Sequence, residues 1–311
     1  MVQASAPRMS RAEFRALLEE VRTWGRWGAD DERGMLNELT PARTLAALRI
    51  PRRGETISLA LPMVKEHTAD TQRPVLHHML GFGHEDEQEQ GYLEDWFAIA
   101  CHGSIHSHLD SLSHRIVDGR GYNGLTREQI AGSGRALRLS VDTVAHGIVT
   151  RGVLLDFPRL LGVEWLEPGA AILPEDLDMA ERTAGLEVGA GDVLLVRTGR
   201  HARRAALGPW DLAATSAGLH ATTARWLRAR GIVALGGDGF SEVIPNGVEE
   251  TVEPMHALTL VAIGIHLLDN LHLDDLAAAC ARERRWEFLF TAAPLRLPGG
   301  TGAPFNPIAV L

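Results

Sequence analysis

The spacing of apolar and polar positions predicts helices that alternate with short strands. A capping box begins at Ser10 and predicts a helix that runs to about Trp27. Thr40 followed by Pro41 is typical of a helix start and predicts a second helix that ends before Pro51. Similar patterns predict three later helices, at Pro174–Ala184, Leu219–Arg230 and Leu273–Arg282.

Strand patterns lie between these helices. Gly54–Leu61 alternates, and the apolar, aromatic stretch Tyr92–Cys101 predicts a buried strand that leads into a histidine-rich segment. Further strands are expected at Gly152–Phe157, Asp192–Arg197, Ile232–Leu235 and Trp286–Thr291. Glycines predict loops at residues 118–124, 236–239 and 298–304. The sequence contains no repeat and no linker, so this mixture of helices and strands predicts a single α/β or α+β domain over residues 1–311.

Composition narrows the class of protein. The formal net charge is -9, which argues against a nucleic-acid partner because binding to phosphates needs a basic face. No stretch reaches the ~20 consecutive apolar residues of a membrane span, and no apolar run of signal-peptide length follows Met1. Cys101 and Cys280 are too few for a disulfide framework. We therefore expect a cytoplasmic protein.

Four histidines fall between residues 102 and 114. On an extended strand, side chains at alternate positions share one face, so His106, His108 and Asp110 should converge, with His102 further along. Imidazole nitrogens and carboxylate oxygens are the usual ligands of zinc and manganese, and three of them leave a position for water. The pattern thus predicts a catalytic metal site.

The segment fits a solvated surface strand or an enzyme nucleophile less well than a metal site. A solvated strand would also be rich in histidine, but the apolar run before Cys101 favours burial, and buried ionisable groups need a metal or a hydrogen-bond network. A serine hydrolase is disfavoured because the chain has no Gly-x-Ser-x-Gly elbow. Cys101 adjoins His102, but neighbouring strand residues point to opposite faces and make poor catalytic partners.

The segment resembles the signature of the metal-dependent cyclase family, which includes bacterial kynurenine formamidase and isatin hydrolase. That signature reads His-x-Gly-Thr-His-x-Asp-x-Pro-x-His. Its second half is present here as His108, Asp110 and His114, while Ser107 stands in place of the threonine and Leu112 in place of the proline. The similarity extends from about residue 24 to residue 311.

The first half of the signature is altered. Ser104 stands where the family has its first histidine, so either His106 or His102 would supply the missing imidazole. Far along the chain, His256 and Asp269 are similar to the family's second ligand segment, although the acid is shorter and displaced by one position. Taken without the resemblance, His256 could be structural and Asp269 could begin a turn.

The resemblance implies a fold, a ligand set and a role for each residue. The implied fold is a single domain with a barrel-like mixed sheet flanked by helices, of the swivelling β/β/α type, after a helical extension over about residues 1–50. His114 is the candidate base, because an imidazole near its ordinary pKa of ~6.5 both accepts and returns a proton. The implied metal ligands are His106, His108, Asp110, His256 and Asp269. Further candidate ligands or supporting groups are His102, Ser104, Asp238 and Glu242, of which the last two could equally be solvated loop residues.

The implied activity is hydrolysis of an amide, a formamide or a lactone in a small molecule, with a divalent ion, Zn or Mn. Family members are commonly homo-oligomers, so a homo-oligomer is expected. Two alternatives are a metal-dependent lyase or cyclase and a non-catalytic metal- or ligand-binding homologue. A chelator assay separates catalysis from mere binding, and the mass of the product separates hydrolysis from isomerisation or dehydration.

Overall fold

A mixed sheet forms the body of the protein in this computed structural model, which describes residues 2–82 and 93–311. Its strands in those ranges are β1 Thr56–Ser58, β4 His108–Asp110, β7 Ile148–Asp156, β9 Val193–Arg197, β11 Ala234–Gly237, β12 His266–Asp269, β13 Glu287–Ala292, β14 Gly302–Pro304 and β15 Ile308–Val310. They are joined in the order β1-β15-β13-β7-β9-β11-β12-β4-β14. β7, β9, β11 and β12 run parallel, and the flanking pairs are antiparallel.

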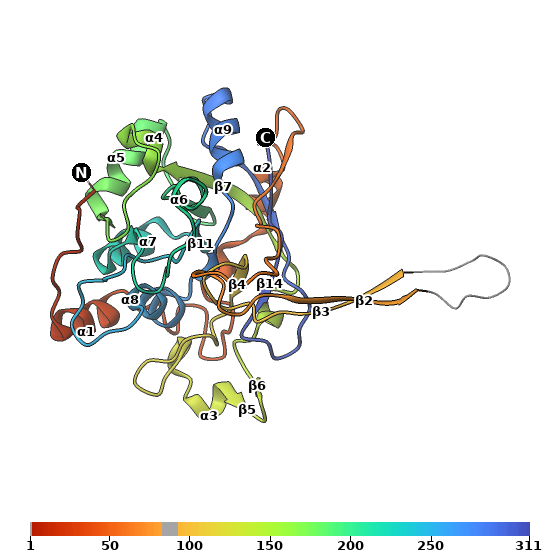
Figure 1. The fold of residues 1–311 in the computed structure, drawn as a ribbon. Helices are drawn as coiled ribbons and strands as arrows, with labels where there is room; N and C mark the ends of the chain where they lie inside the picture. The colour runs from red at the N-terminus through yellow and green to blue at the C-terminus, as the bar shows by residue number, and fades with distance from the viewer. Residues whose placement is uncertain (1, 83–92) are drawn as a thin grey trace.

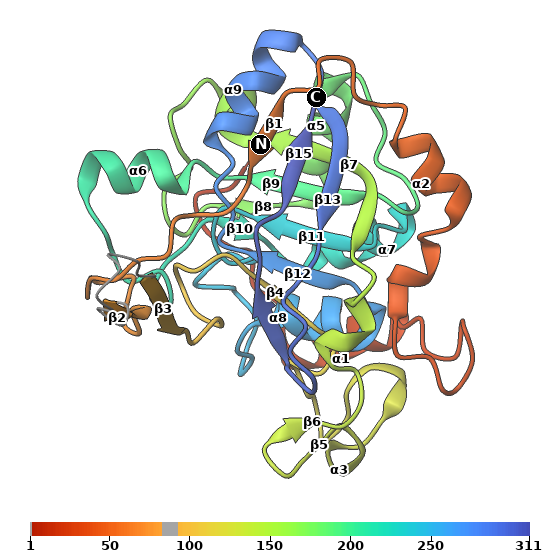
Figure 2. The same ribbon diagram turned by 90° about the vertical axis from the view of Figure 1, so that its right-hand side faces the viewer.

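The sheet curls into an open half-barrel. β14 lies at one edge of the sheet and β15 lies beside the opposite edge, yet only residues 305–307 separate the two strands in the chain. So short a link spans at most about 14 Å, so the two edges must approach one another. Leu59 N donates to Pro307 O and extends the pairing of β1 with β15. The predicted barrel-like mixed sheet is therefore confirmed, as a half-barrel (Figure 2).

The central strands are buried on both faces. Alternate residues enter different hydrophobic cores: Leu155 and Leu267 join one, while Leu154 and Leu268 join the other. Strands covered on both sides read as continuous apolar runs, which is why the sequence marks them well. The four strands predicted at residues 152–157, 192–197, 232–235 and 286–291 all overlap observed strands. Gly236 and Gly237, expected in a loop, extend β11 instead.

Helices cover the sheet (Figure 1). Their bounds are α1 Arg11–Glu20, α2 Pro41–Ala47, α3 Arg127–Ile130, α4 Phe157–Leu161, α5 Pro174–Ala184, α6 Arg200–Leu207, α7 Ala224–Arg230, α8 Pro254–His256 and α9 Asp274–Glu283. A π-helix, η5 Ala257–Ile263, continues α8, and short 3-10 turns cover Gly34–Glu38, Tyr122–Gly124, Val141–Val144 and Ala221–Thr223. None of the helices in the described residues is both long and apolar enough to cross a membrane.

Helix starts are predicted better than helix ends. The capping box at Ser10 and the Thr40–Pro41 start are both present, and α5 has the predicted bounds. The helix expected to reach Trp27 ends at Glu20, and the residues after it form turns in which Gly25 has a positive φ of 76° and Trp24 donates to the carbonyl of Val261. The helix expected from Leu219 begins later, at Ala224, because Leu219 pairs in a small parallel sheet.

The described residues also form three two-stranded sheets. They are β2 Leu76–Phe82 with β3 Leu93–Ala98, β5 Ala131–Gly132 with β6 Arg135–Ala136, and β8 Ala171–Ile172 with β10 Gly218–Leu219. The prediction of a buried strand at residues 92–101 is wrong on burial. Within the described residues β3 pairs only with β2, the two strands project from the body (Figure 1), and Trp96 and Phe97 are exposed. Residue 92 lies outside the described residues.

Candidate metal centre

Strands β4 and β12 place three side chains of the site on one face of the sheet. His108 and Asp110 lie two residues apart on β4 and so share a face. The antiparallel register sets Asp269 of β12 directly opposite His108. Leu109 points the other way, into a hydrophobic core. His108, Asp110 and Asp269 are buried, with at most 2% of each side chain exposed.

The extended strand predicted from His102 onward is wrong for residues 102–107, which form an irregular loop. Gly103, at a positive φ of 149°, helps to turn the chain. The loop folds His102 back over the carboxylate, so that its Nδ1 lies 2.7 Å from Asp110 Oδ1. Gly302 of β14 leaves room for the ring, because a Cβ there would lie 2.7 Å from His102 Cε1. Folding of the chain, not strand parity, brings His102 to the site.

His106 does not join this cluster. Its Nε2 lies 3.3 Å from the carbonyl oxygen of Arg73, in an apolar pocket that also contains Phe97 and Phe305. Its own carbonyl accepts a hydrogen bond of 2.8 Å from His108 Nδ1. The sequence offered two histidines in place of the family histidine at Ser104. The structure places His102 next to Asp110 and His106 away from it.

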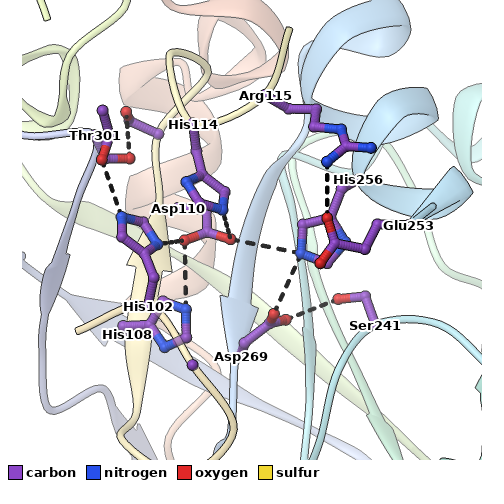
Figure 3. Close-up of polar contacts among 12 residues, drawn as sticks. His102, His108, Asp110, His114, Arg115, Ser241, Glu253, His256, Asp269 and Thr301 are labelled. Carbon is purple, nitrogen blue, oxygen red and sulfur yellow. Dashed lines mark hydrogen bonds and ion pairs between the residues drawn. The ribbon is translucent and has the colours of Figure 1, made fainter. Parts of the chain in front are cut away.

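His256 approaches the same carboxylates from α8. Its Nε2 lies 3.8 Å from Asp110 Oδ2 and 3.6 Å from Asp269 Oδ2 (Figure 3). Its Nδ1 donates a hydrogen bond of 2.7 Å to Glu242, and Ser241 donates to Asp269 over 3.0 Å. Glu242 thus orients His256 from behind, which is one of the roles that the sequence left open for it.

The tautomers of two imidazoles suit a cation. His108 Nδ1 carries its proton toward the carbonyl of His106, and His256 Nδ1 carries its proton toward Glu242. In the neutral rings each Nε2 is then an unprotonated lone pair, and each faces a carboxylate oxygen of Asp110, at 3.4 and 3.8 Å. A lone pair facing an anion is unfavourable unless a proton or a metal ion lies between them, and metal-binding histidines are oriented in this way.

Two groups of atoms could hold a metal ion. One is His102, His108 and Asp110, and the other is Asp110, His256 and Asp269; in each group the ligand atoms lie within 4.8 Å of one another. Asp110 belongs to both. Although its oxygens are buried among nitrogen atoms, neither makes a contact with hydrogen-bond geometry, and nor does His102 Nδ1. Buried polar atoms normally have a partner, so this donor set of imidazoles and carboxylates fits a divalent ion.

The pKa values of the cluster are shifted because several imidazoles surround one buried carboxylate. Burial lowers the pKa of His102, but nearby Asp110 and Cys101 outweigh burial and raise the pKa to about 10. Burial likewise lowers the pKa of His256, and the carboxylates of Asp269 and Glu242 raise it well above its ordinary value. Asp110 has its pKa lowered despite burial, chiefly by His108 and His102. The site therefore favours positive charge beside Asp110.

His114 lies at the accessible edge of the cluster. Its ring stacks on His102 with centroids 3.9 Å apart, and its Nε2 is 3.9 Å from Asp110 Oδ2, too far for a hydrogen bond. The side chain is 29% exposed. Burial lowers the pKa of His114 to about 4, against the charge of Asp110. The imidazole at this edge is neutral and can accept a proton, but its pKa lies below the ordinary ~6.5 on which its assignment as the base rested, which makes it a weaker base.

A buried polar network that the sequence did not reveal holds the loop of His102. Asn270 follows Asp269 and donates to the carbonyl of Gly103 over 2.6 Å, while its Oδ1 accepts from Arg200 over 2.7 Å. Arg200 also donates to the carbonyl of Ser104, so Ser104 contributes its backbone to this network. Both Asn270 and Arg200 come from outside the histidine segment, and their only signal in the sequence is the Asp269-Asn270 pair.

Asp238 serves the fold at some remove from the cluster. Its carboxylate accepts from the backbone N–H groups of Thr198, Gly199 and Arg200, at 2.8 to 3.1 Å. A carboxylate at the start of a helix stabilises it, and α6 begins there. Asp238 therefore holds α6, which carries Arg200, whereas Glu242 contacts the candidate ligand His256 directly.

Replacing Glu242 with glutamine should weaken metal binding at the group that contains His256. The amide keeps the size of the side chain but removes the charge that fixes the ring, and losing such a partner typically costs about 10- to 100-fold in metal affinity. Titration against a chelator measures the affinity, with exposed Glu249→Gln as the matched control. If the variant binds Zn²⁺ and Mn²⁺ as tightly as the parent protein does, Glu242 does not have this role.

Fold and site together define an α/β protein whose half-barrel carries a buried cluster suited to divalent metal. Residues 52–242, more than half of the chain, match the family described as "Putative cyclase". The chain belongs to this cyclase family. The crystal structure of a novel cyclase is 30% identical in sequence, with a TM-score of 0.83 over 94% of this chain and 99% of that chain.

Isatin hydrolases share the fold at lower identity. Isatin hydrolase A from Labrenzia aggregata, solved with benzyl benzoate, is 19% identical, with a TM-score of 0.58 over 88% of this chain and 98% of that chain. The enzyme from Ralstonia solanacearum is 20% identical, with a TM-score of 0.57 over 88% and 99%. No curated protein matches the chain.

Proposed function

We propose that the protein is a metal-dependent hydrolase that cleaves an amide, a formamide or a lactone in a small molecule. The observation that carries the proposal is the carboxylate of Asp110, which lies between two groups of candidate ligands with imidazole lone pairs aimed at it. The fold shared with isatin hydrolases supports the reaction class. In this proposal His102, His108, Asp110, His256 and Asp269 hold one or two ions, Zn or Mn.

The metal supplies two things when bound: water of lowered pKa, and a positive charge that polarises a carbonyl group. The chain's own residues do the rest. His114, neutral at pH 7 and outside both ligand groups, accepts a proton at the accessible edge of the cluster and returns it to the leaving group. Ser241 and Glu242 keep Asp269 and His256 in place, so that the site is organised before the substrate arrives.

Removal of the metal should abolish turnover and lower thermal stability. Dialysis against a chelator is expected to stop hydrolysis of small esters, lactones and formamides, and addition of Zn²⁺ or Mn²⁺ should restore it. An ion that binds only the folded state at a hundred times its Kd stabilises it by about 2.7 kcal/mol, so Tm should rise on reloading. The product of a lactone, or the two products of an ester or a formamide taken together, should weigh one water more than the substrate.

The control is the same assay with Mg²⁺, a poorer partner for imidazole. Unchanged turnover in protein shown by elemental analysis to be free of metal would overturn the proposal. A product of the same mass as the substrate, or lighter by one water, would point to a cyclase or lyase instead. Stoichiometric metal without turnover of any member of the panel would point to a binding protein.

A further inference from the structure

The candidate ligand cluster is accessible from one side. His108, Asp110, His256 and Asp269 have between 1% and 6% of their side chains exposed. His102 and His114, stacked on one another, are 27% and 29% exposed. A substrate therefore reaches the cluster past these two rings, and what lies beside them decides which substrates fit.

A pocket of about 660 Å³ lies against His102. It is formed by the β5–β6 hairpin on one side and the loop of residues 297–302 on the other, with Cys101 and Thr301 next to the histidine. Pockets that take small molecules span roughly 300 to 1,000 Å³. The two walls are tied together, because Ala136 N donates to Gly299 O over 2.8 Å. The pocket is therefore a built feature beside the cluster.

Arg135 gives this pocket its charge. It is the one lining residue with a permanent charge, and no lining residue is a carboxylate. Its aliphatic stem packs on Gly299, where a Cβ would meet Arg135 Cβ at 3.0 Å. Arg135 is exposed, and among the described residues none forms a hydrogen bond or an ion pair with its guanidinium, so the charge is free to meet a ligand in the pocket. A pocket with an arginine on its wall and the candidate metal ligand His102 in its lining is complementary to an anion.

We propose that this pocket takes the non-reacting part of the substrate and that Arg135 pairs with a carboxylate on it. The inference rests on the proposed hydrolase function and names its substrate class: a small carboxylic acid that also carries the ester, amide or lactone bond. The planar guanidinium binds a carboxylate through two parallel hydrogen bonds, which fixes orientation as well as charge. The scissile bond then lies beside His102, the one candidate metal ligand in the lining of the pocket.

The test compares two esters that differ only in charge, 4-acetoxybenzoate and its neutral isostere 4-acetoxybenzamide. The metal-loaded Arg135→Ala variant should lose at least about tenfold in kcat/KM on the benzoate, mainly through KM, because one charged hydrogen-bond partner is removed. Its kcat/KM on the benzamide should stay within about twofold of the parent protein. Arg135→Lys should recover part of the loss, since it restores the charge but not the paired geometry.

Two further measurements keep the outcomes distinct. Calorimetry with 4-hydroxybenzoate should show a Kd about tenfold weaker in Arg135→Ala than in the parent protein. Arg127→Ala, an exposed arginine on the neighbouring helix α3 that does not line the pocket, should change neither readout. If binding depends on Arg135 but no ester, lactone or formamide is hydrolysed, the pocket assignment stands and the proposed hydrolase function is wrong. Hydrolysis or binding that is indifferent to Arg135 would overturn the pocket assignment.

Discussion

Replacing Asp110 with asparagine should remove metal binding from both groups at once. Asp110 belongs to both candidate ligand groups, the one with His102 and His108 and the one with His256 and Asp269. An amide offers a neutral oxygen and an N–H group where the site needs two anionic oxygens. Replacing a group that only supports a ligand typically lowers metal affinity about 10- to 100-fold. Replacing this shared ligand should therefore lower metal affinity more than about 100-fold.

Elemental analysis of the purified variant measures the loss, with hydrolysis as a second readout. Asparagine has nearly the shape of aspartate, so the variant should fold, and circular dichroism checks this. Asp275→Asn, on an aspartate that is 77% exposed on α9, is the matched control and should keep its metal and its activity. A variant Asp110→Asn that retains both metal and turnover would show that the cluster is not a metal centre.

Replacing His114 with alanine should lower turnover strongly and leave the metal in place. The side chain belongs to neither ligand group and is 29% exposed at the edge of the cluster. A positioned acid or base contributes about 10²- to 10⁴-fold to a rate, so we expect kcat to fall by that factor. Turnover on the most reactive ester and metal content should be measured on the same preparation.

The behaviour of His114→Ala separates a proton-transfer role from a ligand role. Loss of metal together with activity would make His114 a ligand. Full activity would assign proton transfer elsewhere. Exposed His146→Ala controls for the general effect of removing an imidazole and should behave like the parent protein.

Local sequence was a good guide wherever one element held the residues concerned. Strand parity placed His108 and Asp110 on a common face, and β4 confirms this. The same rule failed for His102 and His106, because it assumed that the strand extended through a segment that is an irregular loop. The resemblance pointed to His256 and Asp269 far along the chain, and the structure brings both to Asp110.

What the sequence by itself determined was the family, the mixed α/β architecture and most of the chemistry of the site. Apolar runs mark the buried parallel strands, and the spacing of His108, Asp110 and His114 is local. Only the tertiary structure decided that His102 lies over Asp110, that Glu242 orients His256, and that Asn270 and Arg200 hold the loop of His102. These contacts join residues far apart in the chain, and their geometry depends on how the curled sheet and its loops close around one carboxylate. No local period in the sequence encodes such a closure.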